Sequence, residues 1–373
     1  MHVVQALASL TVGGSELVAA ELTQHLVREG HRVTLLSSGG PLAASLKDDR
    51  IDWLDWPVGK KRLSTWKLVG RFAQWLEHKR PDVVHAHSRL PAWVCFLAIR
   101  RLEPKHRPLL VTSVHGQYTV SPYSAIMARG HRVIAVSRFI EGYILENYQF
   151  VDPKCLHVIY GGVNTRRFPY GHKPSTAWFD RCYQAFPELE GKRLLLLPAR
   201  LSRYKGHSSF IELMTRLRPE FEDVHGVIVG PGRPGSRYQA ELEGLAERGG
   251  ILDRISFTGL QLDMRDWMAA SSIVFNLCSD PPEAFGRTVA EALKLGVPVI
   301  AWDQGGVHET LASLFPAGAV PGDHPLALRE KTRQFLHEPP TVAPSEAFEL
   351  EESLSRTLDL YRSGLEDMAC RSS

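Results

Sequence analysis

The stretch DPPEAFGRTVAEALKLGVPVIAWDQGGVHE, residues 280–309, contains a complete turn–helix–strand–turn unit. Helical spacing begins after Gly286 and covers residues 287–295, and a continuous apolar run follows at 297–302. Gly305-Gly306 then opens another helix. A helix that leads into a short, fully apolar strand is typical of a parallel sheet covered by helices. The segment therefore predicts an α/β domain whose turns are rich in glycine and acidic residues.

The same alternation extends over the rest of the chain. In the N-terminal half, apolar strands are predicted at 2–8, 33–37, 82–86, 109–114, 133–136 and 156–160, with helices between them. In the C-terminal half they are predicted at 193–199, 224–230, 255–258, 273–277 and 297–302. Residues 164–191 interrupt the rhythm with several prolines and no clear period, which marks a junction.

A chain of 373 residues is too long for one ordinary core. We therefore predict two Rossmann-like α/β domains that face each other across a cleft, at residues 1–163 and 164–345. Residues 346–373 are predicted to form an amphipathic helix that crosses back to the first domain.

Composition points to the cytoplasm. The five cysteines are scattered and show neither metal-ligand nor redox spacing, which fits a reducing compartment. The N-terminus lacks the pattern of a signal peptide, and no apolar run approaches the ~18 residues of a spanning helix.

Positive charge gathers in the N-terminal half. Residues 1–163 carry 20 Lys and Arg against 13 Asp and Glu, whereas residues 164–373 carry 24 against 28. The basic side chains cluster at Lys60, Lys61, Arg62, Lys67 and Arg71, and again at Arg100, Arg101, Lys105 and Arg107. Each cluster alone is typical of a solvated surface, but two in one half predict an anionic partner. We expect an anionic membrane surface and no nucleic acid.

Glycines and cations follow the first strand of each half. Gly13-Gly14 separates a strand from its helix, where backbone N–H groups can hold an anion, although a plain turn has the same pattern. Ser15 suits a helix cap. In the second half, Arg200 and Lys205 follow a strand and precede Gly206, an arrangement that suits a diphosphate: arginine gives a forked contact and lysine a point charge.

The segment Gly230-Pro231-Gly232-Arg233-Pro234-Gly235 matches a dinucleotide-binding fingerprint in spacing. However, it follows the second strand of its domain, and no acidic residue ends the following strand, 255–258, where a ribose partner is required. A turn of another nucleotide site, or a structural turn, fits Gly230 and Gly232 better than a nicotinamide site.

Two glutamates eight residues apart bracket the start of a helix in the opening segment. Glu283 precedes the helix and is placed to meet the hydroxyls of a sugar, and Glu291, within its first turns, is placed to accept hydrogen bonds from two ribose hydroxyls. Gly286 allows a ligand to approach the backbone, and the helix N-terminus stabilises negative charge. Glutamates near helix starts are also ordinary and favourable, so the pattern alone is not specific.

With these motifs in order, the sequence resembles the retaining glycosyltransferases of the GT-B fold, in the group called family 4. The resemblance covers nearly the whole chain and rests first on Glu283 and Glu291 in their E-x7-E arrangement. Arg200 with Lys205-Gly206 is the second mark. Ile159-Tyr160-Gly161-Gly162-Val163-Asn164 is similar to the family's hinge segment, with Gly161 and Asn164 as departures. Val229-Gly230-Pro231-Gly232 is similar to its glycine turn.

The resemblance implies a role for each of these residues. Arg200 and Lys205 neutralise the departing diphosphate, supported by backbone N–H groups near Phe285 and Gly286. Glu291 holds the nucleotide ribose and Glu283 contacts the donor sugar. His115 matches the family histidine that faces the donor sugar, and Gly13 and Gly14 lie near the acceptor and the diphosphate.

No metal and no other cofactor is expected. Stabilising charge on a leaving nucleoside diphosphate requires fixed cations and a helix dipole more than it requires a nucleophile. No Asp-x-Asp and no cluster with ligand spacing occurs. His85 and His87 are predicted to lie on opposite faces of a strand and so not to share a metal.

We therefore predict a retaining, metal-independent hexosyltransferase that uses a nucleotide-sugar donor, with UDP as the nucleotide, and a glycan or glycolipid acceptor. Lipopolysaccharide core is the expected acceptor, at the inner face of the cytoplasmic membrane. Three alternatives remain open: a GT-B relative that makes a small soluble glycoside or acts as an epimerase, an NAD-dependent oxidoreductase, and a non-enzymatic module that binds acidic polymers.

Overall fold

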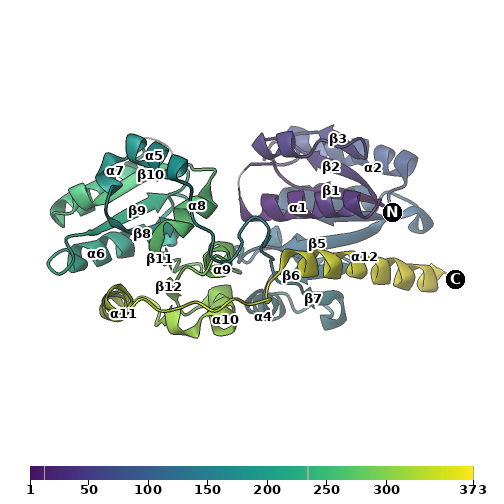
Figure 1. Ribbon diagram of the computed structural model, residues 1–373. Coiled ribbons are helices and arrows are strands. Elements are labelled where there is room, and N and C mark those ends of the chain that lie inside the picture. Colours follow the sequence, from purple (N-terminus) through teal and green to yellow (C-terminus); the bar gives the residue numbers. More distant parts are fainter. Residues whose placement is uncertain (12, 233–234, 373) are drawn as a thin grey trace. The chain divides into compact units, whose positions relative to one another are not determined.

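The computed structural model describes residues 1–11, 13–232 and 235–372, and the chain divides into two compact units (Figure 1). Unit 1 contains Met1–Gly161 together with the C-terminal segment from Glu351, and unit 2 contains Gly162–Leu350. The division falls two residues before the predicted boundary of 163. The second passage between the units falls five residues after the predicted boundary of 345.

Unit 1 is built on a parallel sheet with the strand order β3-β2-β1-β4-β5-β6-β7. Its strands are β1 (His2–Ala6), β2 (Arg32–Ser37), β3 (Ile51–Asp55), β4 (Val83–Ala86), β5 (Leu109–Val114), β6 (Arg132–Ala135) and β7 (Leu156–Val158). Val3 pairs with Val33 on one side and Val83 on the other, and all three side chains are fully buried. These central strands are mostly apolar, and their few polar side chains are buried too, because helices cover both faces of the sheet.

The helices of unit 1 are α1 (Gly14–Arg28), α2 (Lys67–Lys79), α3 (Arg89–Ile99), α4 (Arg138–Asn147) and α12 (Leu350–Ser372). The Ser137 hydroxyl accepts a hydrogen bond from the Ile140 N–H and caps α4. From Glu351 on, α12 belongs to unit 1, and its Tyr361 is fully buried there. The last helix of the chain thus contributes to the same core as the first strand.

Unit 2 has a parallel sheet with the order β10-β9-β8-β11-β12-β13. The strands are β8 (Arg193–Pro198), β9 (Val224–Val229), β10 (Ile255–Gly259), β11 (Ser271–Asn276), β12 (Val299–Trp302) and β13 (Ala319–Val320). The helices are α5 (Thr176–Ala185), α6 (His207–Leu217), α7 (Arg237–Arg248), α8 (Met264–Ala269), α9 (Arg287–Lys294), α10 (Gly305–Leu314) and α11 (Pro325–His337). Since the strands are parallel, the loops after β8, β9, β11 and β12 leave the sheet at the same edge.

The sequence did not predict every element. The edge strands β3 and β13 escaped prediction because β3 alternates with exposed side chains and β13 is only two residues long. Residues 164–191, read as an unpatterned junction, contain α5, whose Ser175 caps it by accepting from the Trp178 N–H. Trp178 and Cys182 are the buried side chains of this helix, too few to produce a clear period.

Candidate functional site

Two loops pack closely at a glycine on the carboxyl edge of the unit 2 sheet. The loop after β8 ends in a short 3-10 helix, Arg203–Lys205, and Gly206 then has a left-handed backbone with φ of 79°. A Cβ at Gly206 would lie 2.1 Å from the carbonyl oxygen of Leu277, in the loop after β11. Ser279 in that loop donates its N–H to the Tyr204 carbonyl at 3.0 Å. Only glycine permits this approach, which places Lys205 against the loop after β11. This loop, residues 277–286, contains Asp280 and Glu283 and is called the acidic loop below.

Lys205 and Glu283, both predicted as site residues, form an ion pair. Their side chains are 17% and 25% exposed, so the pair is largely shielded yet reachable from solvent. Burial acts to lower the pKa of the Lys205 ammonium, but Glu283, Cys278 and Tyr204 together outweigh it and the pKa lies above its ordinary value. Lys205 is therefore a permanent cation, and in the structure the Glu283 carboxylate occupies the place beside it.

The backbone carbonyls of the acidic loop accept hydrogen bonds from the turn between β12 and α10 and from the start of α10. The Gln304 amide donates to the carbonyl oxygens of Cys278 and Ser279 at 2.9 and 3.2 Å. The Gly306 N–H donates to the Glu283 carbonyl at 2.8 Å, and a Cβ at Gly306 would lie 1.9 Å from the Ala284 carbonyl oxygen. Gly306 thus holds the acidic loop by a hydrogen bond, and its lack of a side chain allows the loop to pack closely against it.

The acidic loop ends at the start of α9. Gly286 precedes the helix with φ of 78°, and its N-terminal N–H groups give this end of α9 a partial positive charge. The Phe285 carbonyl accepts a hydrogen bond from the Thr310 hydroxyl at 2.8 Å, and the Phe285 ring contacts Phe348 edge-on at 5.4 Å. Contacts to its carbonyl and to its ring therefore fix Phe285, directly before Gly286.

Glu291 lies one turn into α9 and is buried, with 7% of its surface exposed. Its Oε1 accepts a hydrogen bond from Arg287 Nε at 2.8 Å. The neighbouring cation keeps a carboxylate in a shielded position, where an isolated charge would be costly. Arg287 was not predicted as a site residue, although an i,i+4 spacing from Glu291 is a recognisable signal.

Arg200 lies in the loop after β8, and the predicted glycine turn, Gly230 to Gly232, packs against this loop. Arg200 Nη2 donates to the Tyr204 hydroxyl at 2.8 Å and is exposed. A Cβ at Gly230 would lie 2.2 Å from the Ala199 carbonyl oxygen, and one at Gly232 would lie 2.4 Å from Leu201 Cδ1. Both glycines therefore pack loop against loop, which is the structural role that the sequence left open. Arg233 and Pro234 of the fingerprint spacing lie outside the described residues.

In unit 1, Gly13 and Gly14 begin α1. Gly13 precedes the helix with an extended backbone, and a Cβ there would lie 2.5 Å from Glu16 Oε2. Ser15 is not the cap that the sequence predicted: it is the second residue of α1, and its hydroxyl donates to Glu16 Oε2 at 2.8 Å. Gly13 therefore makes room for the Glu16 carboxylate at the helix N-terminus, whereas a Cβ at Gly14 would meet nothing within 4 Å.

His115 follows β5 in unit 1. Its Nε2 lies 3.1 Å from Nδ1 of His87, and the two rings stack with centroids 5.4 Å apart. Burial lowers the pKa of His115 to about 4, so the imidazole is neutral at physiological pH. The site residues thus fall into two groups, with His115, Gly13 and Gly14 in unit 1 and the others in unit 2.

The prediction that His85 and His87 lie on opposite faces of a strand is wrong. Their ring centroids are 4.1 Å apart, and both side chains are buried. Residues two apart project from the same face of a strand, so the spacing itself indicates the arrangement found. Within residues 1–11, 13–232 and 235–372, no group of three or more His, Cys, Asp or Glu side chains is arranged to hold a metal ion.

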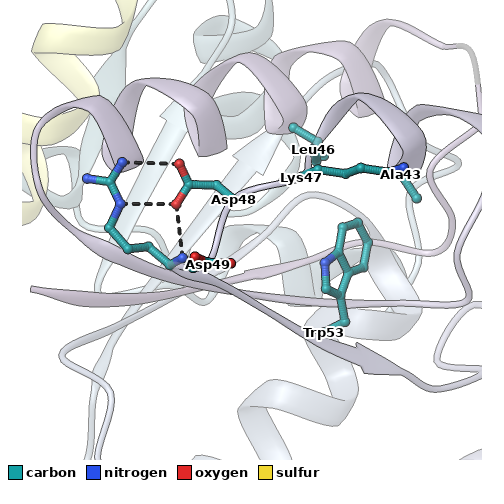
Figure 2. A pocket seen from close by; sticks show the side chains of 7 residues that line it. Ala43, Leu46, Lys47, Asp48, Asp49 and Trp53 are labelled. Atoms are coloured by element: carbon teal, nitrogen blue, oxygen red, sulfur yellow. Dashed lines mark hydrogen bonds and ion pairs between the residues drawn. The ribbon is translucent and has the colours of Figure 1, made fainter.

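A separate hollow lies on unit 1, and none of the predicted site residues lines it (Figure 2). It has a volume of about 790 Å³, and Trp53 and Leu46 line it together with charged residues from Lys47 to Arg50. The Arg50 guanidinium hydrogen-bonds the Asp48 carboxylate and lowers its pKa. The two basic and two acidic residues that line the hollow balance in charge, so it has no net positive charge to attract a diphosphate.

No helix in the described part of the chain has the length and apolar character needed to cross a membrane. The longest, α12, contains charged residues along its whole length.

Comparison with known proteins identifies the class of enzyme that the two sheets and their loops define. Residues 12–167 match the model for Glycosyltransferase Family 4, and residues 183–351 match the model for Glycosyl transferases group 1. The two matches correspond to the two units in order. The chain belongs to the glycosyltransferases that combine these two regions, and the GT-B fold predicted from the sequence is confirmed. These matches favour the transferase over the NAD-dependent and non-enzymatic alternatives.

Solved structures with the same fold cover the full chain. A glycosyltransferase from Rickettsia africae is 22% identical, with a TM-score of 0.80 over 98% of each chain. Anabaena HepE, solved in complex with UDP and glucose, is 20% identical, with a TM-score of 0.76 over 98% of this chain and 99% of its own.

Characterised relatives differ in what they act on. N-acetyl-alpha-D-glucosaminyl L-malate synthase of Bacillus anthracis is 23% identical over 81% of this chain and 78% of its own. D-inositol 3-phosphate glycosyltransferase of Streptomyces coelicolor is 25% identical over 80% and 72%. The lipopolysaccharide core biosynthesis mannosyltransferase LpsB of Rhizobium meliloti is 28% identical over 51% and 53%.

Proposed function

We propose that this glycosyltransferase moves a hexose from a UDP-sugar to a glycan or glycolipid acceptor, with retention of anomeric configuration. The observation that carries the donor site is the shielded Lys205–Glu283 pair beside the N-terminus of α9. A cation and a helix start in one place favour a diphosphate leaving group. HepE, which shares the fold, was solved with UDP, and this supports UDP as the nucleotide here.

The remaining site residues take complementary roles in this proposal. Arg200 adds a second, exposed cation to the diphosphate, and Glu291 accepts hydrogen bonds from the ribose hydroxyls. Glu283 contacts the donor sugar, and binding frees its carboxylate from Lys205, which then pairs with phosphate. Because fixed cations supply the charge stabilisation, we propose that the reaction proceeds without a metal ion or other cofactor.

For the acceptor we propose lipopolysaccharide core, supported by the match to LpsB. The matches to enzymes named for malate and inositol phosphate favour a second candidate, a small soluble hydroxyl acceptor. The two candidates differ in whether transfer requires an oligosaccharide.

The deciding experiment incubates the purified enzyme with UDP-glucose, UDP-galactose or UDP-N-acetylglucosamine, in EDTA, with each acceptor class in turn. UDP release that depends on core oligosaccharide supports the first proposal, and release that depends on malate or inositol phosphate supports the second. The proton spectrum of the product gives the anomeric configuration. Release only after a divalent metal is restored would overturn the metal-independent proposal, and inversion would overturn retention.

A basic and apolar segment supports placement at a membrane surface. Leu63 is 89% exposed and Trp66 43% exposed, on a 3-10 helix flanked by exposed Lys60, Lys61 and Lys67. Apolar side chains rimmed by lysines are suited to the interface of an anionic bilayer. Two exposed members of the same predicted cluster also contact aromatic rings of the protein: Arg71 lies over the Trp56 ring at 4.3 Å and Lys61 over the Tyr123 ring at 5.6 Å.

We propose that residues 60–67 attach the enzyme to the anionic inner face of the cytoplasmic membrane. Co-sedimentation with phosphatidylglycerol vesicles tests this placement. The double variant Leu63→Ser, Trp66→Ser is expected to lose vesicle binding while it retains transfer to a soluble acceptor. Unchanged binding would contradict the placement without affecting the proposed reaction.

A further inference from the structure

A continuous chain of polar side chains begins at the partly buried His115 and runs into the core of unit 1. His115 Nε2 lies 3.1 Å from His87 Nδ1, and His87 Nε2 lies 2.5 Å from Gln5 Oε1. Gln5 is fully buried on the central strand β1, and His87 is 2% exposed. Both ring nitrogens of His87 are thus occupied, one by His115 and the other by the glutamine carbonyl.

Gln5 connects this half of the chain to a second half that reaches α12. Gln5 Nε2 donates to the Tyr361 hydroxyl at 3.3 Å, and that hydroxyl lies 2.6 Å from Nδ1 of His85. His85 Nε2 lies 2.7 Å from Ser113 Oγ. Tyr361 is fully buried, while His85 and Ser113 are almost so, and hence water does not replace any of these contacts.

The orientation of Gln5 determines the direction of every hydrogen bond in the chain. Its carbonyl accepts only, so His87 Nε2 carries the hydrogen in that contact and His87 Nδ1 is an acceptor. His115 Nε2 must then donate to His87, which leaves Nδ1 of His115 without a hydrogen. The Tyr361 hydroxyl, which accepts from Gln5, donates its hydrogen to His85.

We propose that Gln5 and His87 act as positioning residues that fix the tautomer of His115, so that its bare Nδ1 accepts a hydrogen bond from a substrate hydroxyl. In the described part of the chain no hydrogen bond engages this nitrogen, and His115 is only partly buried. The group it recognises must be a donor, which a sugar hydroxyl provides and an unprotonated phosphate oxygen does not. The contact with a sugar hydroxyl rests on the proposed function, whereas the tautomer of His115 follows from the hydrogen bonds alone.

Neutral rings are a requirement of this arrangement, because a protonated imidazole donates from both nitrogens. Burial lowers the pKa of His85 to about 3 and that of His115 to about 4, and it places the pKa of His87 well below its ordinary value. At physiological pH the chain therefore has one hydrogen for each contact between rings and their partners. The positions of these hydrogens are coupled, because reversing one contact reverses the next.

Long-range ¹H–¹⁵N spectra of the ¹⁵N-histidine-labelled protein test the tautomers directly. The signals are assigned by His85→Gln, His87→Gln and His115→Gln, with the exposed His78→Gln as a control for unrelated changes. We expect His85, His87 and His115 each to be neutral at pH 7.5, with the hydrogen on Nε2. A hydrogen on Nδ1 of His115, as in the chain with Gln5 turned round, or a protonated His115 ring, would overturn the proposal.

Two variants separate positioning from general damage to the core. In Gln5→Met, His87 loses its acceptor, and His115 is expected to become a mixture of both tautomers. In Tyr361→Phe, only the far half of the chain is cut, so that His85 is expected to change its spectrum while His115 keeps its hydrogen on Nε2. A His115 spectrum unchanged in folded Gln5→Met would contradict the role of Gln5.

Activity provides a second, independent readout. The oxygen of His115→Asn takes the place of Nδ1, whereas the amide of His115→Gln takes the place of Nε2. If Nδ1 contacts the substrate, the asparagine variant is expected to retain about tenfold more transfer than the glutamine variant, corresponding to about one hydrogen bond. Equal loss in both variants, together with the expected tautomers, would refute the substrate contact alone.

Discussion

The two units present chemically opposite side chains at the positions where the family motifs fall. In unit 2 the groups are charged and paired: Lys205 with Glu283, and Arg287 with Glu291. In unit 1 the buried histidines are neutral and hydrogen-bonded to one another. A permanent cation stabilises a leaving diphosphate, whereas a neutral ring gives a directional contact to a hydroxyl. In the proposed reaction, unit 2 would therefore stabilise the charge of the leaving group and unit 1 would orient the substrate.

The largest expected effect is the loss of the unit 2 cation. Lys205→Ala is expected to lower kcat for transfer by about 10²–10³-fold, because one preorganised charge contact to the leaving group disappears and Glu283 remains unpaired. Steady-state kinetics with whichever of the three UDP-sugars supports transfer measure the change. The exposed Lys192→Ala, in the same unit, is the matched control and is expected to behave like the wild type. A tenfold or smaller loss in Lys205→Ala would place the main charge stabilisation elsewhere.

Acid should affect the neutral histidines of unit 1. Because their pKa values are lowered in the folded protein, the unfolded chain binds more protons below about pH 6.5, and stability falls as pH decreases from 6.5 toward 4. At pH 5 each such histidine is expected to cost about 2 kcal/mol. Urea unfolding from pH 7 to 5 measures this slope.

His85→Gln is the variant that isolates one of these histidines, since glutamine does not titrate. Its stability is expected to depend less steeply on pH than that of the wild type, whereas the exposed His78→Gln is expected to preserve the slope. Parallel slopes in all three proteins would mean that folding does not lower the pKa of His85.

Glu291 allows the ribose contact to be tested by changing the ligand. The wild type is expected to bind UDP about tenfold more tightly than 2′-deoxy-UDP, since a hydrogen bond to a carboxylate is worth about 1.5–3 kcal/mol. In Glu291→Ala the preference is expected to vanish. Calorimetric titrations of both nucleotides measure it. A preference that persists in the variant would assign the ribose to another residue.

The last prediction concerns the fit between the acidic loop and the start of α10. A Cβ at Gly306 would lie 1.9 Å from the Ala284 carbonyl oxygen, so Gly306→Ala is expected to displace the loop and to cost about 1–3 kcal/mol. The melting temperature and the affinity for UDP should both fall. Gly244→Ala, in α7, has only the end of a flexible arginine within 4 Å and is expected to leave both unchanged or to raise stability slightly. A Gly306→Ala variant with wild-type UDP affinity would show that the loop tolerates displacement.

The periodic elements were predictable, and irregular contacts were not. Buried strands such as β5 and β8 were predicted within a residue of their ends, because a short apolar run between helices has one simple interpretation. The family motifs assigned Lys205 and Glu283 to one donor site, but their direct pairing depends on Gly206, whose contact with Leu277 joins residues far apart in sequence. The capping role assigned to Ser15 failed because the helix begins at Gly14, two residues earlier than a cap at Ser15 requires.

The buried chain in unit 1 is the clearest example of what the sequence conceals. Gln5 lies in an apolar strand, and its partner Tyr361 is 356 residues away, so no local pattern connects them. The spacing of His85 and His87 did contain usable information, since residues two apart share a face of a strand. Gln304 and Thr310 support the acidic loop through backbone carbonyls, and such contacts have no signature in side-chain type.

The central claim is that the carboxyl edge of unit 2 binds a nucleoside diphosphate through Lys205. The most direct measurement compares calorimetric affinities for UDP and uridine, in EDTA, for the wild type and Lys205→Ala. We expect the wild type to bind UDP far more tightly than uridine, and the variant to lose most of that difference while its affinity for uridine is preserved. Equal affinity for UDP and uridine in the wild type, or an unchanged difference in the variant, would contradict the claim.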